Sequence, residues 1–144
     1  MKEKTIDYIL RETWLSVARM YNEEASKYGA TMALGFALLN IDKEGTPSTA
    51  LAPKMGMEPT SLTRTLKSME EKGLIVRKKN PKDGRGVIIH LTKLGIEKRE
   101  LSKQTVLRFD EVIKENISEE KLNTLKDVSE TINTLINNKK IFNQ

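Results

Sequence analysis

Apolar residues recur every three or four positions over long stretches near both ends of the chain, the spacing that gathers them on one face of an α-helix. One stretch runs from Ile6 to about Lys27, a second from about Lys93 to Glu115, and a third follows Ser118. The shorter run from Thr31 to Ile41 is apolar on most sides, which indicates a central helix. The pattern predicts a mainly helical protein whose longest helices lie near its two ends.

Breaker residues divide the middle of the chain into shorter elements. Helices are expected over Ser48–Met55 and Pro59–Lys72, with a tight turn at Gly56 between them. Proline suits the first position of a helix, where its missing N–H is not needed. At helical spacing, the expected buried stripe of the second helix consists of Leu62, Leu66 and Met69.

Two segments rich in β-branched residues follow. Leu74–Lys78 and Val87–Leu91 are expected to form strands, and the polar segment Asn80–Gly86 joins them into a β-hairpin. Thr92 and Ser118 are expected to cap the helices that come next. Helix, turn, helix, strand, basic tip and strand is the element order of a winged helix-turn-helix. The predicted fold is mainly α with a small β-hairpin wing (α+β), with long N- and C-terminal helices.

Positive charge is concentrated in one short segment. Residues 64–85 hold eight Lys or Arg against three acids, an excess that equals the net charge of +5 of the whole chain. The remaining 122 residues carry 17 basic and 17 acidic side chains. Such a local excess is the electrostatic footprint of a protein that binds a phosphate backbone, although a solvated basic surface is the commoner reason for a charge run.

The exposed side of the helix predicted at Pro59–Lys72 carries hydroxyl and cationic groups. With the apolar stripe facing the core, a turn of 100° per residue directs these groups outward. Hydroxyls and cations contact phosphates and base edges in a major groove, and Glu70 and Glu71 lie at the far end of the helix. The expected DNA-binding residues of this helix are Thr60, Ser61, Thr63, Arg64 and Lys67.

The tip of the hairpin is a second expected DNA contact. Arg85 is placed to enter a minor groove, where the negative potential is concentrated. Asp83 is placed to orient the Arg85 guanidinium, and Lys82 adds a further positive charge. The alternative for Asp83 and Arg85 is an ordinary exposed turn pair, which contributes little.

Three segments carry a resemblance to a known family: Leu62–Arg77, Asp83-Gly84-Arg85 and His90–Gly95. They resemble the multiple-antibiotic-resistance regulator (MarR) family, which consists of homodimeric winged-helix transcription factors. Most members are repressors that a small ligand or oxidation releases from DNA. Two residues depart from the pattern. The family often has arginine where this chain has Gly84, and Pro53 lies inside a predicted helix, which it should kink or shorten.

The resemblance implies a domain organisation. One MarR-type domain would span residues 1–144, with the winged helix-turn-helix at 31–95 and dimerisation helices at 1–28 and 96–144. The apolar stripes of those helices exceed what the winged part can cover, and the alternative to a homodimer is a three-helix bundle within one chain. A two-fold dimer predicts binding to double-stranded DNA at a pseudo-palindromic operator with half-sites about 10 bp apart.

The resemblance also implies a small-molecule effector, bound between the dimerisation helices and the winged part. An aromatic group beside a cation suits an amphipathic anion such as a phenolic or fatty acid. The alternative is that the aromatic residues belong to the core and Arg108 to a surface ion pair. The absence of cysteine excludes release by thiol oxidation. The candidate ligand-binding residues are Arg11, Trp14, Tyr21, Phe36 and Arg108.

Composition argues against several other functions. The chain has no cysteine and one histidine, His90, which argues against thiol chemistry and a multi-histidine metal site. The sequence shows no nucleophile–base–acid grouping, no phosphate-binding glycine loop and no metal-ligand spacing, so no cofactor and no catalytic residues are expected and the protein is not expected to be an enzyme. The N-terminus lacks the apolar segment of a signal peptide, and the longest apolar-leaning run, Ala30–Ile41, is too short to cross a bilayer. A cytoplasmic protein without a membrane partner is expected.

The sequence therefore predicts a sequence-specific, DNA-binding transcriptional regulator, a homodimeric repressor released by a small amphipathic ligand. The first alternative is a non-specific architectural DNA-binding protein, which shares the basic segment but needs no base-reading helix. A second is a winged helix that serves only protein contacts, which the salt dependence of DNA affinity distinguishes.

Overall fold

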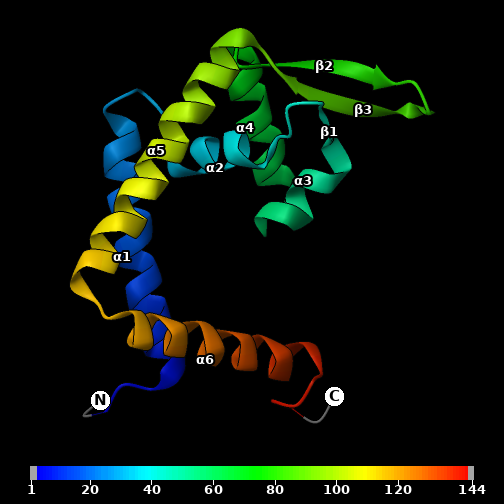
Figure 1. Ribbon diagram of the computed structural model, residues 1–144. Coiled ribbons are helices and arrows are strands. Elements are labelled where there is room, and N and C mark those ends of the chain that lie inside the picture. The colour runs from blue at the N-terminus through cyan, green and yellow to red at the C-terminus, as the bar shows by residue number, and fades with distance from the viewer. Residues whose placement is uncertain (1–2, 143–144) are drawn as a thin grey trace. The chain divides into compact units, whose positions relative to one another are not determined.

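The computed structural model describes residues 3–142, apart from the side chains of Asp83 and Arg85. It contains two compact units, Met1–Lys103 and Gln104–Gln144, and each is described by itself. The elements in chain order are α1 (Ile6–Ser26), α2 (Met32–Asn40), β1 (Thr46–Pro47), α3 (Ser48–Met55), α4 (Pro59–Glu71), β2 (Ile75–Asn80), β3 (Asp83–Leu91), α5 (Lys93–Asn116) and α6 (Glu119–Asn137) (Figure 1).

Polar side chains and a glycine set the ends of the long helices. Thr92 Oγ1 accepts a hydrogen bond from the N–H of Gly95 at the start of α5 (3.0 Å). Ser118 Oγ accepts one from the N–H of Lys121 at the start of α6 (3.2 Å). Gly29 follows α1 with a φ of +67°, the left-handed conformation that ends many helices. Both predicted caps are confirmed.

The sheet is larger than the predicted hairpin. Thr46 and Pro47, expected to lie in a loop, form β1 and pair with Ile89 and Ile88 of β3, which gives the antiparallel order β1-β3-β2. Two residues are too short a run for any strand pattern, and proline is tolerated here because β1 is an edge strand. The predicted hairpin of β2 and β3 is confirmed, whereas the prediction of a loop at Thr46 and Pro47 is wrong.

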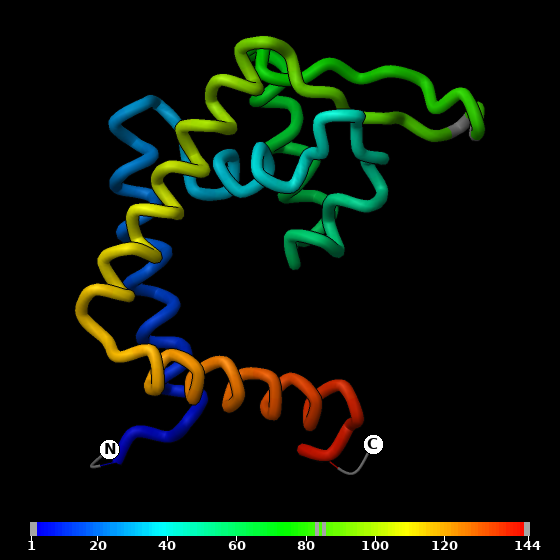
Figure 2. Tube along the Cα trace, in the orientation of Figure 1, coloured from blue at the N-terminus to red at the C-terminus, as the bar shows by residue number. Residues whose placement is uncertain are grey.

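The connection between β2 and β3 is also tighter than predicted. The strands reach Asn80 and Asp83, so that Pro81 and Lys82 alone join them, where a loop over Asn80–Gly86 was expected. The N–H of Lys82 donates to Asn80 Oδ1 at 3.0 Å, which closes the turn. The register shifts between Lys79 and Asn80. Figure 2 shows the hairpin as one extended arm that leaves the helices of the first unit.

The buried core lies in α2, α3, α4 and the sheet. The predicted stripe of α4 is confirmed, since Leu62, Leu66 and Met69 are at most 4% exposed. α3 keeps its predicted bounds, so Pro53 does not shorten it, and Gly56 ends it with a φ of +62°. The core cluster consists of Leu34, Ala37, Leu38, Ile41, Leu51, Leu62, Leu66, Met69, Leu74, Ile75 and Ile89.

A close approach at Gly95 fixes the start of α5 against the segment that joins α4 to β2. A Cβ on Gly95 would lie 2.0 Å from the carbonyl oxygen of Leu74, so that only glycine fits without a shift of the backbone. Beside it, Thr92 Oγ1 donates to the carbonyl oxygen of Gly73 at 2.6 Å, and the Thr92 N–H donates to Leu74 O at 3.0 Å. The first turn of α5 is thereby part of the winged unit.

The terminal helices bury much less. Neither α1 nor α6 has a buried residue, although both carry apolar stripes. Within residues 3–142, no helix combines the length and the apolar character needed to cross a membrane. Exposed apolar side chains include Ile6, Ile9, Leu10, Trp14 and Leu15 on α1 and Leu125, Val128, Leu135 and Ile136 on α6.

Candidate nucleic-acid interface

The outward face of α4 carries the side chains predicted to contact DNA. With its apolar stripe packed in the core, the helix leaves a row of hydroxyl and basic groups exposed. Neither Arg64 nor Lys67 lies within ion-pairing distance of a carboxylate in the part of the chain that the structure describes. The exposed predicted residues are Thr60, Ser61, Thr63, Arg64 and Lys67.

Two hydroxyls of α4 are partly engaged by the helix itself. Thr63 Oγ1 donates to the carbonyl oxygen of Pro59 at 2.8 Å, and Thr65 Oγ1 donates to that of Ser61 at 3.1 Å. A hydroxyl that donates its hydrogen to the backbone keeps only its acceptor capacity. Thr60 and Ser61 are therefore better placed than Thr63 to donate to a phosphate oxygen.

The acids of this region lie at both ends of α4, and one of them was missed. Glu70 Oε2 lies 3.4 Å from Arg77 Nε, which ties the end of α4 to β2. Glu58 is the N-cap residue of α4, makes no side-chain capping hydrogen bond and is exposed. The sequence pattern predicts acids only at the far end of the helix, at Glu70 and Glu71. The N-cap position of Glu58, one residue before Pro59, was the available signal.

A groove runs along the N-terminal part of α4. It has a volume of about 640 Å³ and lies open between α3 and α4. Its polar lining includes Ser48, Thr49 and Thr63, with Arg77 of β2 at its side. Leu62 and Leu66 of the core-facing stripe also line the groove, so it lies beside the exposed face of α4 and does not form part of it.

The wing adds further positive charge. Lys78 and Lys79 of β2 are exposed, as is Lys82 in the turn. The predicted contact between Asp83 and Arg85 lies outside the side chains that the structure describes. Basic side chains therefore extend from α4 along the hairpin arm.

The candidate ligand residues belong to both units, four to the first and Arg108 to the second. Tyr21 and Phe36 meet edge to face, with ring centroids 5.7 Å apart. Trp14 is 52% exposed on α1. Arg11 pairs with an acid on its own helix, and Arg108, in the second unit, lies 3.2 Å from Glu111 Oε1. Of the four candidates in the first unit, Tyr21 and Phe36 are in contact with each other.

The partner of Arg11 is Asp7, a carboxylate on the surface of α1. The Thr5 hydroxyl, and then the Arg11 guanidinium 3.7 Å away, lower the pKa of Asp7 below its usual value. The hydrogen bond and the charge of Glu24 raise the pKa of Lys27. Both groups are on the surface of α1, and no cluster of three metal-binding side chains occurs among the described residues. Nothing in these shifts points to acid–base chemistry.

Fold and site together define a winged helix-turn-helix protein with a basic recognition face. The profile of the MarR family matches residues 31–87, from the start of α2 into β3. The HTH-type transcriptional regulator YdgJ of Bacillus subtilis (strain 168), described as uncharacterized, is 35% identical over 88 residues, 61% of this chain and 54% of YdgJ. The HTH-type transcriptional repressor MdtR of the same strain is 30% identical over 100 residues, 64% of each chain. The chain thus spans only about half to two thirds of these curated relatives.

Solved structures share the fold over most of the chain. S. aureus MepR in a complex with DNA aligns with a TM-score of 0.82 at 20% sequence identity. The alignment covers 92% of this chain and 100% of the MepR chain. A cysteine-to-serine mutant of MarR from E. coli, complexed with operator DNA, has a TM-score of 0.78 at 24% identity over 88% and 92% of the two chains. At such identities the likeness shows the fold alone.

The chain belongs to the MarR family of winged helix-turn-helix transcriptional regulators. The predicted family and fold class are confirmed, and the family consists of regulators rather than enzymes.

Proposed function

We propose that this protein is a sequence-specific transcriptional regulator that binds double-stranded DNA as a homodimer. The observation that supports this most strongly is the outward face of α4, where hydroxyls and cations are exposed while the opposite face is fixed in the core. A recognition helix of this fold reads base edges from its N-terminal turns. The role would place the protein in the cytoplasm.

Some side chains of α4 are assigned to bases and others to phosphates. Arg64, with its planar fork, suits a bidentate contact to guanine in the major groove, and Lys67 suits a guanine or a phosphate. The hydroxyls of Thr60 and Ser61 suit phosphate oxygens, which fix the register of the helix without reading sequence. The Thr63 hydroxyl, which donates its hydrogen to Pro59 O, would instead accept a hydrogen bond from a donor on a base edge.

In the wing, Lys82 and Arg85 are assigned to the backbone and minor groove of the flanking duplex, with Asp83 orienting the Arg85 guanidinium. This assignment rests on their positions in the turn and at the start of β3.

The homodimer is supported by the apolar side chains that the single chain leaves exposed. Leu125 and Ile136 of α6 are 57% and 56% exposed, and Ile6 of α1 is 64% exposed. Apolar surface of this kind is a liability unless a partner covers it. A second copy would cover it and bring two α4 helices to one pseudo-palindromic operator. The proposed dimerisation segments are residues 1–28 and 96–144.

We also propose that the protein is a repressor which a small amphipathic anion releases. Trp14 and Tyr21 are seven residues apart on α1, and Arg11 is near them on the same face. Tyr21 touches Phe36 of α2, so a ligand there would contact a helix of the winged part. Arg108 remains a candidate from the second unit. Because Trp14 is the only tryptophan, quenching of its fluorescence by a phenolic or fatty acid tests this site, and unchanged emission at millimolar ligand would count against it.

The alternative is an architectural DNA-binding protein that uses the same basic segment without reading sequence. A competition titration separates the two. A duplex selected by the protein from random DNA should outcompete bulk DNA by ~10³ or more for a regulator. Equal competition by random duplex favours the architectural role.

Substitutions then test which residues carry the selectivity. Arg64→Ala should weaken binding to the selected duplex by about 1–3 kcal/mol and relax the preference at one position in each half-site, whereas Lys82→Ala should weaken all duplexes about equally. Lys98→Ala removes one positive charge from the exposed surface of α5 and is the matched control. A selected motif that is unchanged by Arg64→Ala and Lys67→Ala would contradict the assignment of α4.

A further inference from the structure

The C-terminal end of α2 lacks the usual glycine cap. Ile41 follows the helix in an extended conformation, with φ −92° and ψ 118°, so the left-handed cap of other helices is absent here. The last carbonyl groups of a helix have no partner within it and, when buried, need donors from elsewhere. Leu38, in this last turn, is only 1% exposed.

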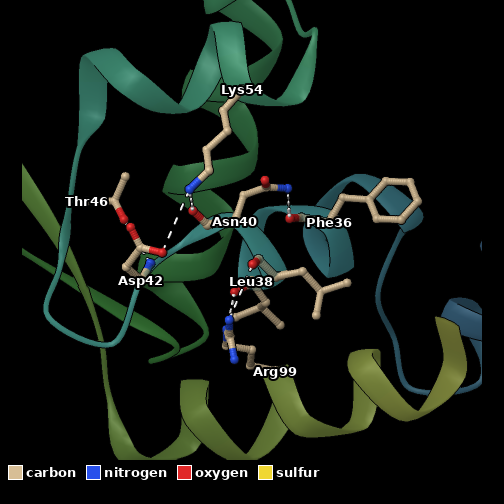
Figure 3. A network of polar contacts seen from close by, with 8 residues as sticks. Phe36, Leu38, Asn40, Asp42, Thr46, Lys54 and Arg99 are labelled. Atoms are coloured by element: carbon tan, nitrogen blue, oxygen red, sulfur yellow. Dashed lines mark hydrogen bonds and ion pairs between the residues drawn. The ribbon is translucent and has the colours of Figure 1, made fainter. Parts of the chain in front are cut away.

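Two cationic side chains from different helices supply those donors (Figure 3). Arg99 of α5 donates from Nε to Leu38 O at 3.1 Å, and from Nη2 to Leu39 O at 3.5 Å. Lys54 of α3 donates from Nζ to Asn40 O at 3.1 Å. Three successive carbonyl groups of α2 are therefore each bound by a cation, at the end of the helix where the dipole favours positive charge.

Lys54 also links the end of α2 to the sheet through Asp42 and Thr46. Lys54 Nζ lies 3.8 Å from Asp42 Oδ1. The N–H of Asp42 donates to Thr46 Oγ1 at 2.8 Å, and Thr46, the first residue of β1, is 3% exposed. As Figure 3 shows, α2, α3, β1 and α5 all contribute to this small cluster.

Arg99 and Lys54 join different parts of the molecule. Lys54 connects two helices inside the winged helix-turn-helix. Arg99 connects that unit to α5, the helix that continues into the second unit. A planar guanidinium that binds two successive carbonyls fixes a direction as well as a distance, which a lysine ammonium does not.

We propose that Arg99 is a positioning residue for DNA recognition. Its two hydrogen bonds to Leu38 and Leu39 fix the direction in which α5 leaves the winged helix-turn-helix, and thereby the separation of the two α4 helices in the dimer. The inference rests on the proposed function, because this separation matters only if two copies bind one duplex. Each α4 must then meet its own half-site, about one helical turn from the other.

A purely structural cap would behave differently. It would contribute to the stability of α2, and its loss would lower the thermal midpoint, but the folded protein would keep its preference for one half-site spacing. A positioning residue changes that preference even in protein that remains folded. The spacing preference is therefore the readout that distinguishes the two roles.

The experiment uses the full chain and the duplex that the parent protein selects from random DNA, with versions that carry one or two inserted base pairs between the half-sites. Arg99→Gln and Lys98→Gln remove the same charge at adjacent positions of α5, and the Lys98 side chain is exposed. Arg99→Lys keeps the charge and loses the fork. Thermal unfolding of each variant is recorded, and affinities are measured well below the lowest midpoint.

The parent and Lys98→Gln should prefer the selected spacing by about tenfold or more, the discrimination expected from misplacing one set of base contacts. Arg99→Lys and Arg99→Gln should bind that duplex about tenfold more weakly and lose most of the spacing preference. For random DNA, the affinity of Arg99→Lys should lie within about twofold of the parent's and that of Arg99→Gln within about twofold of that of Lys98→Gln, because each pair has the same charge. Arg99→Lys remains informative if Arg99→Gln is too unstable to measure.

Unchanged spacing preference in folded Arg99→Lys would overturn the proposed role and leave Arg99 as a helix cap. A parent protein without preference for any duplex would contradict the proposed function, and this inference with it.

Discussion

The two units of the chain differ in how far they bury their apolar side chains. In Met1–Lys103, the apolar residues of α2, α3, α4 and the sheet form one cluster in which each member is at most 6% exposed. In Gln104–Gln144, no residue of α6 is buried among those described, and Leu125 and Ile136 are more than half exposed. The helix-turn-helix is complete within one chain, whereas α6 has the pattern of a helix that needs a partner. α1, although in the first unit, resembles α6 in this respect.

Substitutions in the two regions should therefore affect different properties, stability in the core and association of two chains in α6. The largest effect is expected for a core residue. Leu51→Ala, at a position that is 0% exposed, should lower the free energy of unfolding by about 3 to 4 kcal/mol. Leu125→Ala should instead weaken association of two chains and leave the winged unit folded. Urea unfolding and sedimentation equilibrium measure the two effects. A Leu125→Ala protein that associates as well as the parent would remove the reason for assigning α6 to the dimer.

The second largest effect is expected at Gly95, where the start of α5 packs closely against the winged helix-turn-helix. Gly95→Ala places a Cβ where the carbonyl oxygen of Leu74 lies, and it should cost about 2 to 3 kcal/mol as an overpacked site. At an unconstrained helix position the same change would stabilise by about 1 kcal/mol. Gly84→Ala is the control, because nothing lies within 4 Å of the added atom. A Gly95→Ala protein as stable as the parent would show that this junction is not tightly packed.

A smaller effect concerns the acid at the N-cap of α4. Glu58 is exposed beside the proposed DNA contacts, so its carboxylate should repel phosphates. Glu58→Gln should strengthen binding to random duplex about threefold to tenfold at low salt and lower the ratio of specific to non-specific affinity. Glu120→Gln, at the start of α6, is the matched control. If Glu58→Gln weakens binding to the selected duplex instead, the carboxylate accepts a hydrogen bond from a base.

The smallest effect is on the surface of α1. The pKa of Asp7 is lowered, first by the Thr5 hydroxyl, so the charged carboxylate is favoured in the folded protein. Its contribution to stability is fully present above the ordinary carboxyl pKa and is lost as the pH falls through the lowered value. In Thr5→Ala, an NMR titration should return the pKa of Asp7 toward its usual value. An unchanged titration would assign the shift to Arg11.

The contrast between the units also explains what the sequence could predict. The stripe of Leu62, Leu66 and Met69 identified the buried face of α4 because the partners of that stripe lie within the same chain. β1 could not be predicted, since Thr46 and Pro47 become a strand only by pairing with β3.

The candidate sites divide in the same way. The exposed face of α4 followed from helical geometry alone. The ligand residues come from distant segments; within the first unit Tyr21 and Phe36 are in contact, and the ligand site itself stays a prediction. The sequence gives no indication that Arg99 binds the end of α2, because Arg99 is one of many basic residues on a charged helix and its acceptors are backbone carbonyl oxygens.

Hydroxyl-radical footprinting of the selected duplex tests most directly the claim that two copies place their α4 helices on one DNA. The account predicts protection that is symmetric about a dyad, with two half-sites about one helical turn apart, and flanking protection that Lys82→Ala weakens. A single asymmetric footprint, or uniform protection without a dyad, would contradict it.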